Sequence, residues 1–127
     1  MEYRGHGNMK DVTCRLFPDC VLFRLSMHYS LDSLKRFIKF AKKILDLNHL
    51  KNTIVDLRFM PESIPVMDRY ELGVMIAEKF PFKYKLAVLA KREFITKFAE
   101  TVAVNRGAEM LVSHDLKEIR KWFKSKE

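Results

Sequence analysis

The sequence predicts an α/β sandwich with the element order ββαβαβαβα, in which an antiparallel N-terminal hairpin leads into a mostly parallel mixed sheet. Runs of β-forming apolar residues alternate along the chain with segments whose apolar residues recur at helical spacing. Turn chemistry at Pro18 and Asp19 separates the first two strand-like runs. Strands that alternate with helices are typical of parallel sheets with right-handed crossovers.

Length and composition indicate one domain. The chain has 127 residues, of which 48% are hydrophobic and 31% charged, which is ordinary for a globular protein. Residues 1–10 are polar, contain Gly5 and Gly7 and lack the apolar centre of a secretory signal. No apolar run approaches the ~20 residues that span a bilayer. We therefore expect a flexible tail over residues 1–10, one domain over residues 11–127, no transmembrane segment and a cytoplasmic location.

The hairpin and the first helix come first in the chain. Residues 12–17 and 20–27 are rich in β-formers and predict two antiparallel strands. Ser30 is a good N-cap, and Asp32 suits the positive end of the helix dipole. The helix should end near residues 46–48, and its buried stripe comprises Leu31, Leu34, Phe37, Ile38, Ala41, Ile44 and Leu45.

A short apolar run and a second helix follow. Residues 53–57 are mostly apolar, which is typical of a strand buried on both faces of a parallel sheet. Residues 58–65 form a loop that opens the helix, with Ser63 as N-cap and Pro65 in the first turn. Gly73 permits close packing against a neighbour. The predicted inward face of this helix comprises Val66, Tyr70, Val74 and Ala77.

The last third of the chain repeats the alternation. Residues 84–90 predict a strand, and residues 92–105 a third helix with Gly107 at its C-terminal cap. Residues 109–112 predict a final strand. Asp115 should cap a last helix that turns Leu116, Ile119 and Phe123 inward, with Trp122 beside them.

The basic balance, a formal charge of +8 with a pI near 9.6, raises the question of an anionic partner. Lysines gather on the polar face of the first helix and in the C-terminal helix, where solvated helix faces explain them. Acidic proteins, phosphates and membrane surfaces remain the alternatives. No stacking aromatics accompany these clusters, so we do not expect nucleic acid to be the partner.

Two cysteines, Cys14 and Cys20, flank the predicted turn and would lie roughly opposite each other across the hairpin. In a reducing compartment they should be free thiols, with a redox pair as the alternative. The histidines share no metal-ligand spacing with each other or with the cysteines. We expect no metal and no cofactor.

The segment from residue 56 to residue 73 carries the most chemistry. Asp56 and Arg58 lie where a buried strand ends, and Ser63 lies at a helix start. In open α/β sheets ligands bind at this edge, because helix N-termini favour anions. The segment is therefore a candidate anion-binding or regulatory site, and a capped helix with a solvated loop is the plainer interpretation.

Catalytic patterns are absent from the sequence. Asp68 and Glu71 form a carboxylate pair, but Arg69 lies between them, so ion pairs on the surface or between helices explain them better. There is neither a phosphate-binding glycine loop nor a GxSxG elbow. We expect that the protein is not an enzyme.

The chain resembles a known family in three segments. These are residues 56–58 (Asp-Leu-Arg), residues 67–73 (MDRYELG) and residues 98–107 (FAETVAVNRG). They are similar to recurring motifs of small bacterial and archaeal STAS-like proteins. That family is grouped with the anti-sigma-factor antagonists and, more remotely, with the CRAL-TRIO lipid-binding domains. The resemblance covers roughly residues 10–125 and implies the STAS-like sandwich; most small members have no established function.

The resemblance also implies a regulatory serine. In the anti-sigma-factor antagonists a serine at the corresponding helix start is phosphorylated and switches partner binding. Laid on that pattern, this chain has Glu62 at the phosphorylated position and Ser63 one residue later, and Ile64 and Pro65 replace the usual glycines. Phosphorylation would therefore fall on Ser63, where the added charge would stabilise the helix start.

These observations favour a non-enzymatic STAS-like interaction or sensing domain that regulates through protein–protein binding. Its expected surface comprises Arg58, Glu62, Ser63, Asp68, Arg69 and Glu71. The alternative is a carrier for a small apolar ligand or lipid, with a pocket lined by Phe59, Met60, Met67, Met75, Phe80 and Phe82 unless these are simply core. Exposed Ile64 and Met67 would also suit a homodimer.

Overall fold

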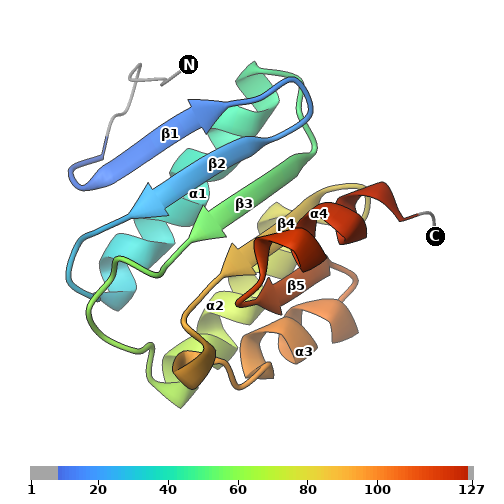
Figure 1. Cartoon of the computed structure of the whole chain (residues 1–127). Coiled ribbons are helices and arrows are strands. Elements are labelled where there is room, and N and C mark those ends of the chain that lie inside the picture. Colours follow the sequence, from blue (N-terminus) through green and yellow to red (C-terminus); the bar gives the residue numbers. More distant parts are fainter. Residues whose placement is uncertain (1–8, 126–127) are drawn as a thin grey trace.

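A computed structural model of the chain describes residues 9–125 (Figure 1). It confirms the predicted element order. The predicted tail lies largely outside the described residues. The elements are β1 (Val12–Leu16), β2 (Val21–Leu25), α1 (Leu31–Leu47), β3 (Asn52–Asp56), α2 (Val66–Lys79), β4 (Lys85–Leu89), a 3-10 turn (Arg92–Phe94), α3 (Phe98–Asn105), β5 (Glu109–Ser113) and α4 (Leu116–Lys124).

The five strands form one mixed sheet in the order β1-β2-β3-β4-β5. Strand β1 pairs antiparallel with β2, and the remaining neighbours pair in parallel. The predicted α/β class and hairpin are therefore confirmed. Because β2 to β5 run in the same direction, the segments that follow them gather at one edge of the sheet, which we call the carboxyl edge (Figure 1).

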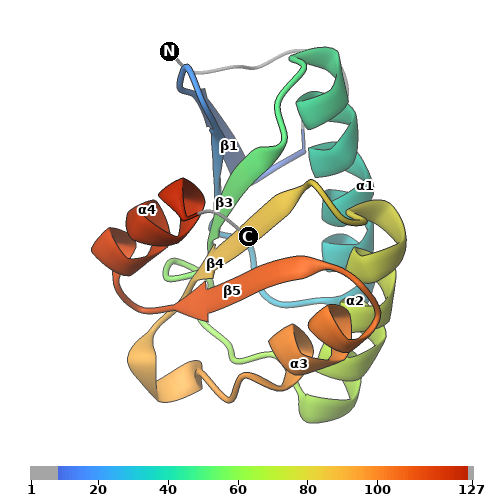
Figure 2. The same ribbon diagram turned by 90° about the vertical axis from the view of Figure 1, so that its right-hand side faces the viewer.

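Each parallel crossover moves the chain one strand further in the same direction. Crossovers of the same hand that step in one direction place their helices on one face of the sheet. Helices α1, α2 and α3 accordingly lie together on one side, and α4 lies on the other (Figure 2). The main core lies under the three helices and includes Phe23, Phe37 and Ile44.

The opposite face is only partly covered. Helix α4 packs over β4 and β5 and buries Ile119 against Ile54 and Leu89. No helix in residues 9–125 covers the same face of β1 and β2, where Arg15 and Arg24 are exposed (Figures 1 and 2).

The hairpin register separates the two cysteines, so the expectation that they face each other was wrong. Cys14 pairs with Phe23 and belongs to the core beneath the three helices. Cys20 precedes β2 and packs with the α4 side. Both thiols are free and buried, and desolvation raises the pKa of each to about 11.

Helix α1 follows the prediction closely. The Ser30 side chain accepts a hydrogen bond from the Ser33 amide at 3.2 Å, which confirms the N-cap. The predicted stripe is buried except for Leu31, which is partly exposed in the first turn.

Helix α2 differs from the prediction in its start and in its buried face. It begins at Val66 with Pro65 as N-cap, and Ser63 makes no cap hydrogen bond. The buried residues are Leu72, Gly73 and Ile76, whereas Val66 and Tyr70 are exposed. The helix lies between α1 and α3, so the residues that face both neighbours and the sheet define its buried stripe.

The predicted third helix is interrupted. A 3-10 turn at Arg92–Phe94 ends in extended backbone at Ile95, and Lys97 takes a left-handed φ of 64° before α3 starts. The prediction of continuous helix from residue 92 was therefore wrong. Gly107 has a φ of 98° just beyond the end of α3, as its predicted cap role requires.

The final helix is capped as predicted, because the Asp115 side chain accepts from the Lys117 amide at 2.9 Å. Ile119 is fully buried, and Trp122 and Phe123 are partly buried against the sheet. Leu116, which was expected to face inward, is 39% exposed.

Gly73 sets the distance between α2 and α3. A Cβ placed on it would lie 2.9 Å from the Ala99 carbonyl oxygen and 3.0 Å from Val102 Cβ. The first of these contacts is with backbone, which cannot rotate away. This confirms the predicted close approach.

We predict that Gly73→Ala lowers the free energy of unfolding by about 1–3 kcal/mol, because overpacking outweighs the better helix propensity of alanine. Urea denaturation followed by circular dichroism measures the change. Glu78→Ala, on the exposed side of the same helix, is the control and should change little. A Gly73→Ala protein as stable as the wild type would contradict this account of the packing.

Candidate functional site

The predicted site residues all lie at or near the carboxyl edge, in the loop after β3 and the first turns of α2 (Figure 1). Most of them contact residues from distant parts of the chain. These contacts divide the region into a buried carboxylate cluster, a latch between two loops, and a polar mouth above an apolar cavity.

The buried carboxylate is Asp56, the last residue of β3, which is 1% exposed. Arg58 donates to it from its backbone N–H and Nε, both at 3.0 Å to Oδ1, and from Nη2 at 2.9 Å to Oδ2. Nε of Arg24, on β2, also donates to Asp56 Oδ2, at 3.4 Å. Burial raises the pKa of Asp56, but the hydrogen bonds and charge of Arg58, helped by Arg24, outweigh it and hold the pKa below its ordinary value.

The two guanidiniums also share an aromatic neighbour. The Arg24 guanidinium lies 4.5 Å from the centre of the half-exposed Phe59 ring, and that of Arg58 lies 5.7 Å from it. Exposed aromatic and basic side chains therefore do meet at this edge, which sequence reasoning about the helix clusters did not anticipate.

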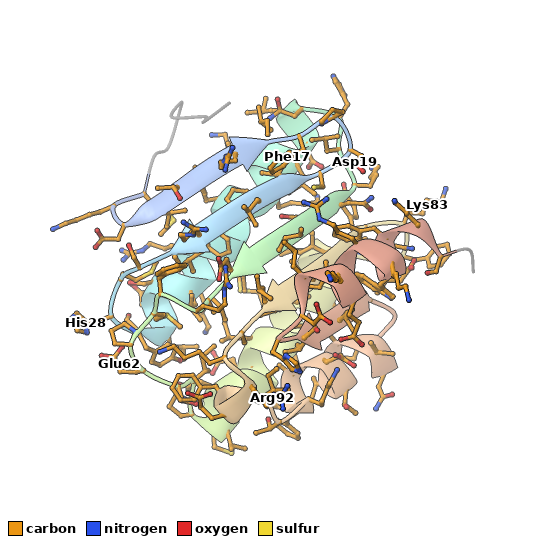
Figure 3. The ribbon with its side chains drawn as sticks, viewed as in Figure 1. Phe17, Asp19, His28, Glu62, Lys83 and Arg92 are labelled. Atoms are coloured by element: carbon orange, nitrogen blue, oxygen red, sulfur yellow. The ribbon has the colours of Figure 1, made fainter. Side chains whose placement is uncertain are left out.

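Glu62 links the loop before α1 to the loop before α2. We call its contacts with His28 and Tyr29 the latch. Its Oε1 accepts from the Tyr29 amide at 2.7 Å, and its Oε2 lies 2.6 Å from Nδ1 of His28. Figure 3 shows His28 and Glu62 side by side at the edge of the molecule. The hydrogen bond and charge of Glu62 raise the pKa of His28, and the Tyr29 amide and His28 lower the pKa of Glu62.

Asp68 and Glu71 attach α2 to α1 and the loop before it. The Tyr29 hydroxyl donates to Asp68 Oδ2 at 2.6 Å, and Lys35 of α1 forms an ion pair with Glu71. The prediction that these carboxylates serve ion pairs between helices is confirmed for Glu71. Burial and the bond to Asp68 raise the pKa of Tyr29 well above its ordinary value.

Arg69 joins the loop before α2 to the segment before α3. Its Nε donates to the Ile64 carbonyl at 2.7 Å, Nη2 to the Ser63 hydroxyl at 2.8 Å, and Nη1 to the Thr96 hydroxyl at 2.6 Å. Ser63 therefore lies beside a guanidinium and not at a helix cap. Desolvation lowers the pKa of Arg69 from its ordinary value.

Beneath Arg69 lies a cavity of about 120 Å³ between the sheet and the three helices. The body of the cavity is apolar and is lined by residues that include Leu34, Phe37 and Val88. Its polar lining residues include Ser63, Arg69 and Thr96, and we call these three the mouth. Of the residues predicted to line a pocket, Met60 and Phe80 do so. Phe59, Met67 and Phe82 are exposed instead, and Met75 packs against the core.

The sequence did not indicate Arg24, His28, Tyr29 and Thr96 as site residues. They reach the predicted residues from 27 to 39 positions away along the chain, so no local spacing marks them. Only the parallel register, which brings successive strand ends to one edge, could have suggested that the loops meet.

The sequence matches no model in a scan of known protein families, and a search of curated proteins also finds no match. Among residues 9–125, no helix is both long and apolar enough to cross a membrane. In the same part of the chain, no three histidine, cysteine or acidic side chains gather as metal ligands would.

The latch gives a prediction about pH. We expect the His28 pKa to lie above 6.5 in the wild type and to return toward 6.5 in Glu62→Gln. The raised His28 pKa contributes stability that is complete below 6.5 and is lost as the pH rises through the folded value. The lowered Glu62 pKa contributes stability above 4.5 that is lost as the pH falls, so both contributions are present between 4.5 and 6.5.

Titration of the imidazole resonances by NMR measures these values. Glu118→Gln, on α4, removes a carboxylate far from the latch and should leave the His28 titration unchanged. A His28 pKa that does not move in Glu62→Gln would show that the latch is not formed in solution.

Proposed function

We propose that the protein is a cytoplasmic, non-enzymatic STAS-like domain that regulates by binding a protein partner at the carboxyl edge. The observation that carries this proposal is the exposed apolar strip on the first turns of α2. Met67 is 77% exposed, Val66 58% and Tyr70 43%. We call these three residues the α2 strip.

The surroundings of the α2 strip suit recognition. Protein interfaces combine an apolar centre with a polar rim. Glu62, Asp68, Arg69 and Glu71 supply that rim, and each is already held by an intramolecular bond. Side chains that are ordered before binding lose less conformational entropy in the complex.

The phosphorylation of Ser63 remains a prediction, but its physical rationale changes. Because α2 begins at Val66, a phosphate on Ser63 would be placed to pair with Arg69, whose Nη2 already donates to the hydroxyl. A charge-assisted pair with a guanidinium is a strong contact. Phosphorylation would thus alter the rim beside the α2 strip and not the helix cap.

The test introduces a charge into the α2 strip. Met67→Asp should reduce capture of the partner at least tenfold, because an apolar anchor is replaced by a group that must be desolvated. Phe82→Asp is the matched control, since Phe82 is 61% exposed in the turn before β4, at the opposite edge of the sheet. Crosslinking in the native host followed by quantitative mass spectrometry measures capture.

The outcome distinguishes three cases. A partner lost with Met67→Asp and retained with Phe82→Asp supports the proposal. A partner retained with both variants overturns it. If the protein instead captures its own copies through the α2 strip, light scattering will show a dimer in the wild type and a monomer in Met67→Asp, and the partner is a second copy of this chain.

The cavity favours a second function, binding of a small apolar ligand. An engineered cavity of about 150 Å³ binds benzene, so a cavity of about 120 Å³ has room for a ligand of roughly that size. Apolar lining and a few polar groups at the opening are typical of ligand sites. Such a ligand would make the domain a sensor or a carrier.

Filling the cavity tests this second function. Ala90 lines it, and Ala90→Leu should reduce the occupied fraction of the purified protein at least severalfold, because the new side chain takes the ligand's place. Native mass spectrometry measures that fraction. An apo mass for the wild type, together with no binding of added apolar probes, would exclude the function.

A further inference from the structure

The mouth of the cavity carries hydrogen-bond donors that have no acceptor among residues 9–125. A guanidinium has five N–H donors, and three of those on Arg69 are used by Ile64, Ser63 and Thr96, which leaves two. These two N–H groups donate to no atom of residues 9–125. The hydroxyls of Ser63 and Thr96 each accept from Arg69 and likewise donate to no described atom.

The mouth also carries an uncompensated positive charge. All three acceptors of Arg69 are neutral oxygens, and no carboxylate of the described residues lies within ion-pair distance of it. Glu62, the acidic residue among the described lining residues, is held by His28 and the Tyr29 amide. The other arginine of the predicted surface, Arg58, is by contrast paired with Asp56.

The Arg69 side chain is partly buried, so its positive charge is partly removed from water. A charge removed from water without a partner is destabilising, and proteins normally pair it. Lys97 also lines the cavity, but its Nζ is paired with Glu100 and donates to the Val112 carbonyl, so its charge is already compensated. The mouth therefore complements an acceptor-rich anion, while the body below it complements hydrocarbon.

We propose that the ligand of the cavity is a short aliphatic monocarboxylate. Its carboxylate would accept from Arg69, Ser63 and Thr96, and its chain would extend down toward Leu34, Phe37 and Val88. The planar guanidinium matches a carboxylate in a two-bond geometry. The cavity volume suits a chain of roughly four to six carbons.

This inference rests on the proposed ligand-binding function and deepens it. It would make the carboxyl edge a place where ligand and partner meet. Arg69 bonds Ser63 and Ile64 directly before the helix that bears the α2 strip, so an anion bound to the remaining N–H groups of Arg69 would contact the loop that leads into the strip.

The test compares two probes of equal length. Hexanoate carries the charge and 1-hexanol does not, so we expect hexanoate to bind the wild-type protein about ten- to a hundredfold more tightly, as charge-assisted hydrogen bonds allow. Titration followed by ¹H–¹⁵N NMR gives both dissociation constants. The Arg69 Nε–H resonance should move with hexanoate and stay in place with hexanol.

Variants assign the preference to Arg69. Arg69→Met keeps the apolar stem and should reduce the ratio of the two dissociation constants to near one, whereas Arg69→Lys should retain part of it. Arg58→Met is not a suitable control, because it removes the main ion-pair partner of the buried Asp56. Arg92→Met, on the exposed 3-10 turn, removes a charge nearby and should leave the ratio unchanged.

The outcomes separate the two levels of the proposal. Equal affinity for hexanoate and hexanol in the wild type overturns the carboxylate inference and leaves apolar binding intact. If neither probe binds at about 10 mM, the ligand-binding function itself is overturned. Even a site with a dissociation constant of about 1 mM, which corresponds to a binding free energy of only ~4 kcal/mol, would be nearly saturated at that concentration. The wild-type comparison stands even if Arg69→Met does not fold.

Discussion

The uniform direction of the crossovers is the constraint on which the rest of the structure depends. Because the chain steps from β2 to β5 one strand at a time, its three crossover helices must share one face of the sheet. That face encloses the apolar cavity, and the same step order brings every strand-exit loop to one edge. The topology thus places a hollow core and a row of polar loops next to each other, and Arg69 lies where they meet.

The charged side chains at the carboxyl edge have different roles, and the bonding partners of each side chain show which role it has. Asp56 is buried and satisfied by Arg58 and Arg24, so this cluster fixes the exit of β3. Glu62 and Asp68 bond to the loop before α1 and hold neighbouring loops together. Within the described part of the chain Arg69 has only neutral partners, so it is able to receive an anion, whereas the charges of the other groups are already paired.

Local signals predicted the elements well and the long-range contacts poorly. Ser30, Asp115 and Gly107 act within one helix turn, and sequence alone placed them correctly. The α2 start and the break at Lys97 depend on how the segments pack, and helix propensity does not report that. The site was predicted as a segment, since strand ends bind ligands in such sheets. Its partners come from β2, the loop before α1 and the segment before α3, which no spacing in the chain connects.

The two cysteines give this fold built-in reporters for its two layers. Each thiol is buried, Cys14 beneath the helices that enclose the cavity and Cys20 on the side of α4. A thiol reacts as the thiolate and only when exposed, so labelling of each records the opening of its own layer. A movement that opens the core beneath α1, α2 and α3 but leaves α4 in place would therefore appear as selective modification of Cys14.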